Sequence, residues 1–123
     1  MNKIDLPDVQ ADSTRLIQVL GNLVNNALMY TPGGGSIHIT ASVEEGFVRF
    51  EVRDSGIGIS DADQEKLFSP FFRSDDEAVR ELQGWGLALH VSQLLVQAQG
   101  GEIGVNSQLK GGSAFWFTLP AQA

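Results

Sequence analysis

Two asparagines one helical turn apart, Asn22 and Asn26, have a type and spacing that could do chemistry. On a helix, at about 100° per residue, their amides point the same way along the margin of an apolar stripe. An amide oxygen so placed can bind a hard cation such as Mg²⁺, which prefers oxygen ligands and keeps waters and phosphates as its others. The alternative is a solvated polar face that also includes Asn25, although asparagine is a mediocre helix former.

A second candidate site is the segment Asp54-Ser-Gly56-Ile-Gly58, which directly follows a predicted strand. A carboxylate there can accept a hydrogen bond from an exocyclic amine, and the glycines let the backbone come close to a flat ligand. Asp-Ser-Gly is also an ordinary turn sequence. Both interpretations stay open on this segment alone.

A third candidate is the glycine-rich segment Gly84-Trp85-Gly86-Leu87, which leads into a predicted helix. Free N–H groups and the positive end of the helix dipole make such a segment a natural seat for phosphate. The segment lacks the lysine of a P-loop, and Gly-x-Gly alone is poor evidence.

Apolar periodicity predicts the elements that position these candidates. Helices are expected over 12–30, 61–68 and 86–99, with glycines after the first and the last. Alternation of apolar and polar residues predicts strands over 36–43, 47–53, 102–107 and 113–119. In the first of these strands we expect one buried face, formed by Ile37, Ile39, Ala41 and Val43. This order predicts an α+β fold, with helices layered on one face of a mixed, mainly antiparallel sheet.

Composition narrows the functional classes. The chain has 123 residues, 15 acidic against 8 basic, and no cysteine, so we expect one domain without disulfides, thiolate metal sites or a cysteine nucleophile. The net charge of −7 argues against a general nucleic-acid surface. No run of about 18 apolar residues and no signal-like start is present, so we expect a cytoplasmic domain that does not insert into a membrane. Whether the full-length protein is membrane-anchored stays open.

The order and spacing of the motifs together are more specific than any one of them. The series is Asn-x-x-x-Asn-Ala-x-x-Tyr-Thr, Asp-x-Gly-x-Gly-Ile, Phe68-x-x-Phe71-Phe72-Arg73 and Gly-x-Gly-Leu-x-Leu. It resembles the ATP-binding catalytic domain of sensor histidine kinases, from Asp12 to Pro120. The resemblance implies a two-layer α/β sandwich of the Bergerat type, a single domain over 1–123 with a lid over about 69–85, and Mg²⁺ and ATP as ligands.

The resemblance also implies roles and partners. Asn26 would ligate Mg²⁺, Asn22 would lie beside the phosphates, Tyr30 would pack on the adenine, and Asp54 would hold its amine. The further nucleotide-binding positions implied are Gly56, Gly58, Ile59, Phe72, Arg73, Arg80, Gly84, Gly86, Leu87, Ala88, Leu89 and Thr118. The phosphoryl group would pass to a histidine on a dimerisation domain of the same protein that this chain lacks, and a response regulator would be an indirect partner.

Three positions depart from related patterns. In hydrolases of this fold, and in serine kinases that act as anti-sigma factors, a glutamate that activates the nucleophile stands at the position of Asn22. An amide cannot take up a proton there, which favours a histidine kinase over an autonomous ATPase. Met29 stands where a basic residue is frequent and Ala88 replaces a glycine. These two favour the alternative of a degenerate nucleotide-binding or docking module with weak or no kinase activity.

Overall fold

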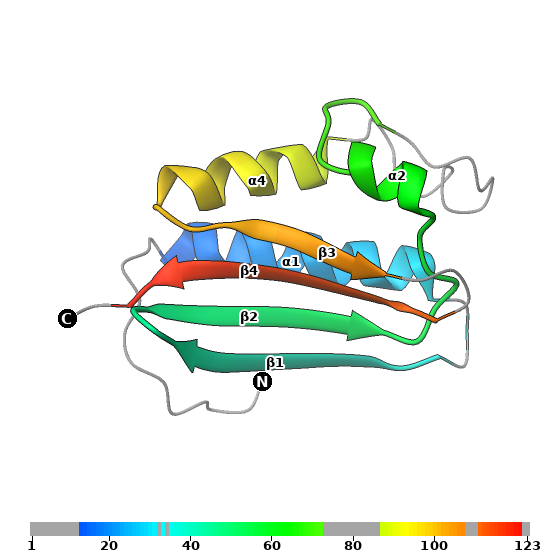
Figure 1. Ribbon diagram of the computed structural model, residues 1–123, viewed down its shortest axis with the longest axis horizontal. Helices are drawn as coiled ribbons and strands as arrows, with labels where there is room; N and C mark the ends of the chain where they lie inside the picture. Colours follow the sequence, from blue (N-terminus) through cyan, green and yellow to red (C-terminus); the bar gives the residue numbers. More distant parts are fainter. Residues whose placement is uncertain (1–12, 32, 34, 73–86, 108–110, 122–123) are drawn as a thin grey trace.

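The protein folds into a helical layer on one face of a four-stranded sheet (Figure 1). The computed structural model describes residues 13–31, 33, 35–72, 87–107 and 111–121. The elements are α1 (Ser13–Tyr30), β1 (Ile37–Glu44), β2 (Phe47–Asp54), α2 (Asp61–Lys66), α4 (Ala88–Ala98), β3 (Ile103–Ser107) and β4 (Ser113–Pro120). The predicted elements are therefore confirmed, with bounds that shift by at most two residues within the described ranges.

The sheet has the order β1-β2-β4-β3, and its three strand pairings are all antiparallel. The parallel component that a mixed sheet would need is absent from the described strands. The central pair β2 and β4 places Val52 opposite Phe115 and Phe50 opposite Phe117. The rings of Phe50 and Phe117 stack with centroids 5.0 Å apart. These side chains face the helices and form the sheet side of the hydrophobic core.

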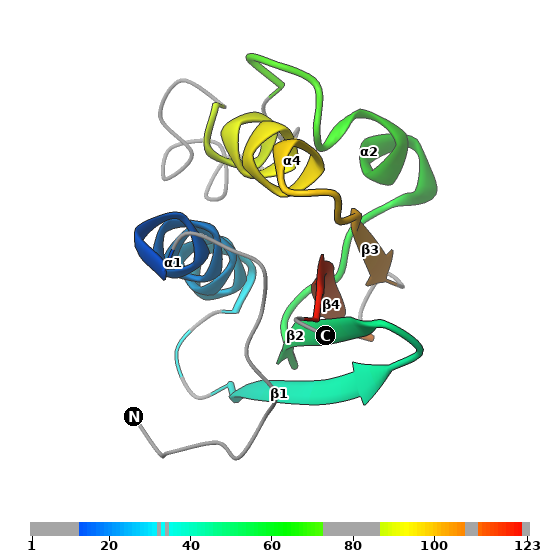
Figure 2. The ribbon, with the colours of Figure 1, turned by 90° about the vertical axis from the view of Figure 1, so that its left-hand side faces the viewer.

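The helices cover the sheet because their apolar residues recur at helical spacing. Val19, Leu23 and Ala27 of α1 are buried against β2 and β4, and Val96 of α4 is buried on β3 and β4. Figure 2 shows α1 and α4 lying over the sheet, with β1 at the far edge. No helix among the described residues is long and apolar enough to cross a lipid bilayer.

The first strand corrects a prediction. The side chains of Ile39 and Val43 are 47% and 58% exposed, although alternation predicted a buried face. The strand forms and pairs antiparallel with β2, but it is the edge strand, and the helices pack on β2, β4 and β3 instead. Alternation in a sequence identifies a face of a strand and does not say whether a helix covers it.

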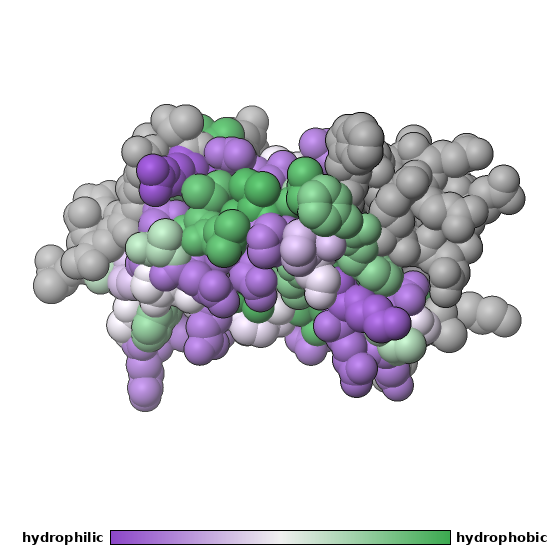
Figure 3. All heavy atoms as spheres, turned by 90° about the horizontal axis from the view of Figure 1, so that it is seen from above, coloured by the Kyte–Doolittle hydropathy of each residue, from purple (hydrophilic) through white to green (hydrophobic). Residues whose placement is uncertain are grey.

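The helical face also keeps apolar side chains in contact with solvent. Viewed from this side, green apolar atoms gather between polar ones (Figure 3). The large apolar side chains that stay exposed on the helices and on the loop after α2 are Ile17, Leu28, Leu94 and Phe71. The core of the domain is thus formed by only part of the apolar surface of its helices.

We expect Phe117→Ala to lower the free energy of unfolding by about 3–5 kcal/mol, because it removes a fully buried ring from the centre of the core. Val43→Thr, at an exposed position of β1, should change it by about 0.5 kcal/mol or less. Urea unfolding followed by circular dichroism measures both. A large loss of stability in Val43→Thr would mean that this face of β1 is buried, contrary to the structure.

Candidate functional site

The segment that carries Asp54 docks against the end of α1. The Ile57 N–H donates to the carbonyl of Tyr30 at 3.0 Å, which satisfies one of the backbone acceptors that a helix leaves free at its end. Gly56 lies so close that a Cβ there would be 1.8 Å from the same carbonyl oxygen. A glycine is therefore required at position 56. The contact brings together Asn26, Tyr30 and Asp54, which are 3%, 2% and 4% exposed.

The Asp54 carboxylate is only half satisfied. Its Oδ1 accepts a hydrogen bond from the Gly56 N–H at 2.9 Å, whereas its buried Oδ2 has no hydrogen-bond partner. Burial raises the pKa of Asp54 above 3.8, and the backbone of Gly56 and Ser113 and the Thr31 hydroxyl counteract this. The Thr31 hydroxyl lowers the pKa of Asp54 from a nearby position, although its oxygen has no hydrogen-bond partner. Because buried acceptors are rarely left unpaired, Oδ2 is suited to a donor that comes from a ligand.

The two asparagines of α1 have different surroundings. The Nδ2 atom of Asn26 is buried and has no hydrogen-bond partner. The Nδ2 atom of Asn22 donates to Ser92 Oγ at 3.0 Å and, at 3.4 Å, to the carbonyl of Ala88. Asn22 therefore joins α1 to the first turns of α4. Sequence reasoning placed Asn22 beside the phosphates and did not foresee this link between helices.

The start of α4 fits the predicted phosphate seat in part. Leu87 is the N-cap residue and makes no side-chain capping bond, so its side chain does not compete with an anion for the first N–H groups of α4. Ala88 is exposed, whereas Leu89 is buried in the core. Arg73, Arg80, Gly84 and Gly86, with most of the predicted lid, lie outside the described residues.

Four more predicted residues can be placed. Gly58 takes a φ of +75°, a conformation that favours glycine. Ile59 is buried, and Phe72 packs against the core. Thr118 lies in another part of the sheet. It pairs with Arg49, five residues along β2 from Asp54, or about 17 Å at strand spacing. Its hydroxyl accepts the N–H of Glu102. Thr118 therefore lies away from the residues gathered around Asp54.

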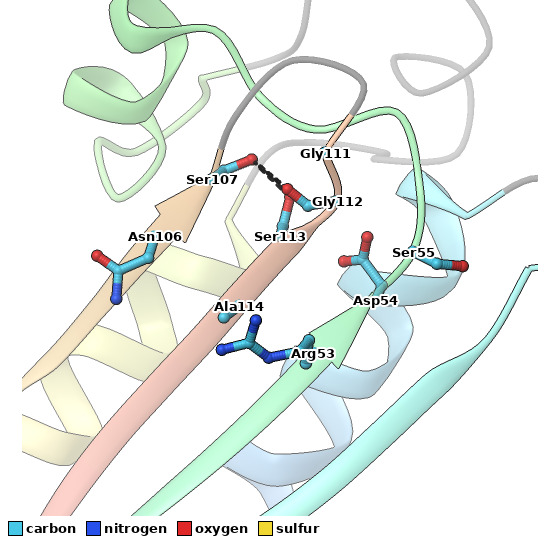
Figure 4. Close-up of a pocket in the computed structure, with 9 residues that line it drawn as sticks. All are labelled: Arg53, Asp54, Ser55, Asn106, Ser107, Gly111, Gly112, Ser113 and Ala114. Carbon is cyan, nitrogen blue, oxygen red and sulfur yellow. Dashed lines mark hydrogen bonds between the residues drawn. The ribbon is translucent and has the colours of Figure 1, made fainter.

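A pocket of about 440 Å³ opens at the ends of β2, β3 and β4 (Figure 4). Neighbouring residues of β2 point apart here, with Arg53 directed toward Ala114 and Asp54 directed away from it. Ser107 and Ser113, whose hydroxyls hydrogen-bond at 2.8 Å, form another part of the lining. Sequence reasoning assigned neither serine to the site, because their pairing depends on the register of β3 with β4.

Comparisons with known proteins agree with this geometry. Residues 11–123 match the family model described as histidine kinase-, DNA gyrase B-, and HSP90-like ATPase. The chain is 42% identical to the sensor histidine kinase WalK of Bacillus subtilis, over 94% of this chain and 20% of that protein. It is 42% identical to the adaptive-response sensory kinase SasA of a Synechococcus species, over 95% of this chain and 31% of that one.

Solved structures have the same fold. A mycobacterial sensor histidine kinase, MprB, superimposes with a TM-score of 0.81 at 28% identity, over 93% of this chain and 77% of that one. Full-length ShkA in complex with AMPPNP gives a TM-score of 0.79 at 35% identity, over 96% of this chain and 24% of that one. The chain spans less than a third of the length of the curated relatives described above.

We expect Asp54→Asn to raise the free energy of unfolding at neutral pH. Because the pKa of Asp54 is raised in the folded state, the ionised carboxyl opposes folding, and Asn removes that cost. The stabilisation by Asn is therefore full at neutral pH, shrinks as the pH falls through the pKa of Asp54 in the folded state, and vanishes below 3.8. Urea unfolding across this pH range measures the effect, with the exposed Glu45→Gln as control. A destabilised Asp54→Asn at pH 7 would contradict it.

Proposed function

Since the chain belongs to the histidine kinase-, DNA gyrase B-, and HSP90-like ATPase family, as the ATP-binding catalytic domain of a sensor histidine kinase, we propose that it transfers the γ-phosphoryl group of Mg-ATP to a histidine. The acceptor would lie on a dimerisation domain of the same protein, and a response regulator would receive the group afterwards. We place this reaction in the cytoplasm. No comparison favours a degenerate docking module.

The unpartnered Oδ2 of Asp54 is the observation that carries this proposal. The exocyclic amine of adenine would donate to it and so pair the one carboxylate oxygen that the fold leaves unbonded. Guanine has a carbonyl oxygen in the corresponding place and would face the carboxylate with like partial charge. The arrangement therefore favours ATP over GTP.

Asn26 fits a magnesium ligand. Its amide is buried with an unpartnered nitrogen, and a 180° rotation about the Cβ–Cγ bond exchanges that nitrogen with the oxygen. The amide oxygen is a suitable ligand for Mg²⁺. When bound, the ion supplies charge neutralisation and orientation to the triphosphate. On this proposal Asn26 holds the ion and the first N–H groups of α4 hold phosphate oxygens.

The chain itself contributes positioning more than proton transfer. Asn22 is an amide and so cannot act as a base, and its nitrogen is engaged with Ser92. The nucleophile is then the acceptor imidazole, whose nitrogen forms the new bond to phosphorus while the bond to the ADP oxygen breaks. Phosphoryl transfer depends mainly on alignment and charge stabilisation, so a domain without a general base suffices.

We expect Asp54→Asn to weaken binding of a non-hydrolysable ATP analogue about 10- to 100-fold, since a hydrogen bond to a charged group is lost. The preference for the ATP analogue over the GTP analogue should fall with it. Calorimetric titration with Mg²⁺ measures both, and Glu45→Gln should bind as the unchanged chain does. An unchanged preference would refute the role of Asp54, and no binding by the unchanged chain at millimolar nucleotide would refute the function.

Transfer is tested with the phosphoacceptor domain of the full-length protein supplied in trans and γ-labelled ATP. We expect labelled phosphohistidine that disappears when Mg²⁺ is chelated and falls at least tenfold in Asn26→Ala. The neighbouring Asn25→Ala, at an exposed position of the same helix, is the matched control and should retain the activity. Nucleotide binding without any phosphohistidine would contradict phosphoryl transfer and would favour a nucleotide-binding module without kinase activity.

A further inference from the structure

Ser107, the last residue of β3, uses the full hydrogen-bonding capacity of its hydroxyl. The oxygen accepts the N–H of Ile59 at 2.8 Å and lies 2.9 Å from the carbonyl of Gly112 and 2.8 Å from Ser113 Oγ. A hydroxyl has one proton, and a carbonyl can only accept. Ser107 therefore donates to Gly112, and Ser113 donates to Ser107.

Gln64 of α2 completes this arrangement. Its Nε2 donates to the carbonyl of Ile59 at 2.7 Å and to the carbonyl of Ser107 at 3.1 Å. Both backbone polar groups of Ile59 are thus fixed, the N–H by Ser107 and the carbonyl by Gln64. Ile59 is also 2% exposed. The segment from Asp54 to Ile59 is therefore fixed at its end, as it is fixed at Gly56 and Ile57 against α1.

The same network reaches the backbone of Asp54 from the other side. Gly112, which accepts from Ser107, packs so tightly that a Cβ there would be 2.2 Å from the Asp54 carbonyl oxygen. Ser113 faces Asp54 in the pairing of β2 with β4, and its backbone lowers the pKa of that carboxyl. Figure 4 shows the Ser107–Ser113 bond at the strand ends beside Asp54. Asp54 is enclosed between α1 and this network.

We propose that Ser107 is a positioning residue for purine selection: its hydroxyl, together with the amide of Gln64, holds the 54–59 segment and the β3–β4 strand ends so that Asp54 Oδ2 is presented to the base. The inference rests on the proposed function, since it assumes that Asp54 reads the adenine amine. Discrimination between bases needs a carboxylate held within about 0.5 Å, and a loosened segment would let it adapt to either purine.

The test compares Ser107→Ala with the unchanged chain by calorimetric titration of non-hydrolysable ATP and GTP analogues in Mg²⁺. We expect the ATP-over-GTP preference to fall about tenfold in Ser107→Ala and to recover most of its value in Ser107→Thr, which keeps the hydroxyl. Gln64→Met, which leaves the Ile59 carbonyl without its donor, should lower the preference in the same direction. It provides a second readout should Ser107→Ala fail to fold.

Two further variants separate positioning from stability. Val48→Ala removes buried methyl groups at the other end of β2, six residues from Asp54, which should lower the melting temperature and leave the preference unchanged. In an Asp54→Asn background, Ser107→Ala should have no further effect on the preference, because the two residues act through one carboxylate.

The outcomes are distinct. An unchanged preference in Ser107→Ala or Gln64→Met, or an equal fall in Val48→Ala, overturns the inference while the proposed function stands. An additive effect of Ser107→Ala on Asp54→Asn also overturns it. Absence of nucleotide binding in the unchanged chain refutes the proposed function itself, before any variant is compared.

Discussion

The Asp54 carboxylate is buried where β2 ends, and the fold leaves one of its oxygens without a hydrogen-bond partner. An unpaired buried acceptor destabilises the folded state, and the same burial raises the pKa of Asp54. The surrounding contacts keep it in place, because Gly56 packs against the Tyr30 carbonyl and Gly112 packs against the Asp54 backbone carbonyl so closely that no side chain fits at either position. On the proposed function, the domain gives up stability at this point to keep a fixed acceptor for the base.

The rest of the fold is organised around the end of the sheet where that carboxylate lies. The paired side chains of β2 and β4 form the surface on which α1 packs. This packing brings Asn26 and Tyr30 of α1 to the end of the sheet where Asp54 lies. The link from Asn22 to Ser92 then joins α4 to α1. Packing, rather than charge, therefore positions a buried acid, a buried amide and the start of a helix in a domain of net charge −7.

Local periodicity was enough to predict the helices and strands. The motifs singled out Asn26 and Asp54, whose side chains the fold buries with one unpartnered polar atom each, and their roles toward a nucleotide stay predictions. What depends on distant pairing was out of reach. The exposure of Ile39 follows from β1 being an edge strand, and the place of Thr118 follows from its register with Arg49. The bond from Ile59 to Ser107 joins residues 48 positions apart and leaves no pattern in the sequence. Gln64 was missed for the same reason.

The central claim is that Asp54 Oδ2 is left unpaired for the amine of adenine, and a crystal structure with Mg²⁺ and a non-hydrolysable ATP analogue tests it most directly. The account predicts that the exocyclic nitrogen lies within about 2.7–3.2 Å of Oδ2 while Oδ1 keeps its bond to the Gly56 N–H. A base bound elsewhere, with Oδ2 still unpaired or with the carboxylate turned away from Gly56, would contradict it.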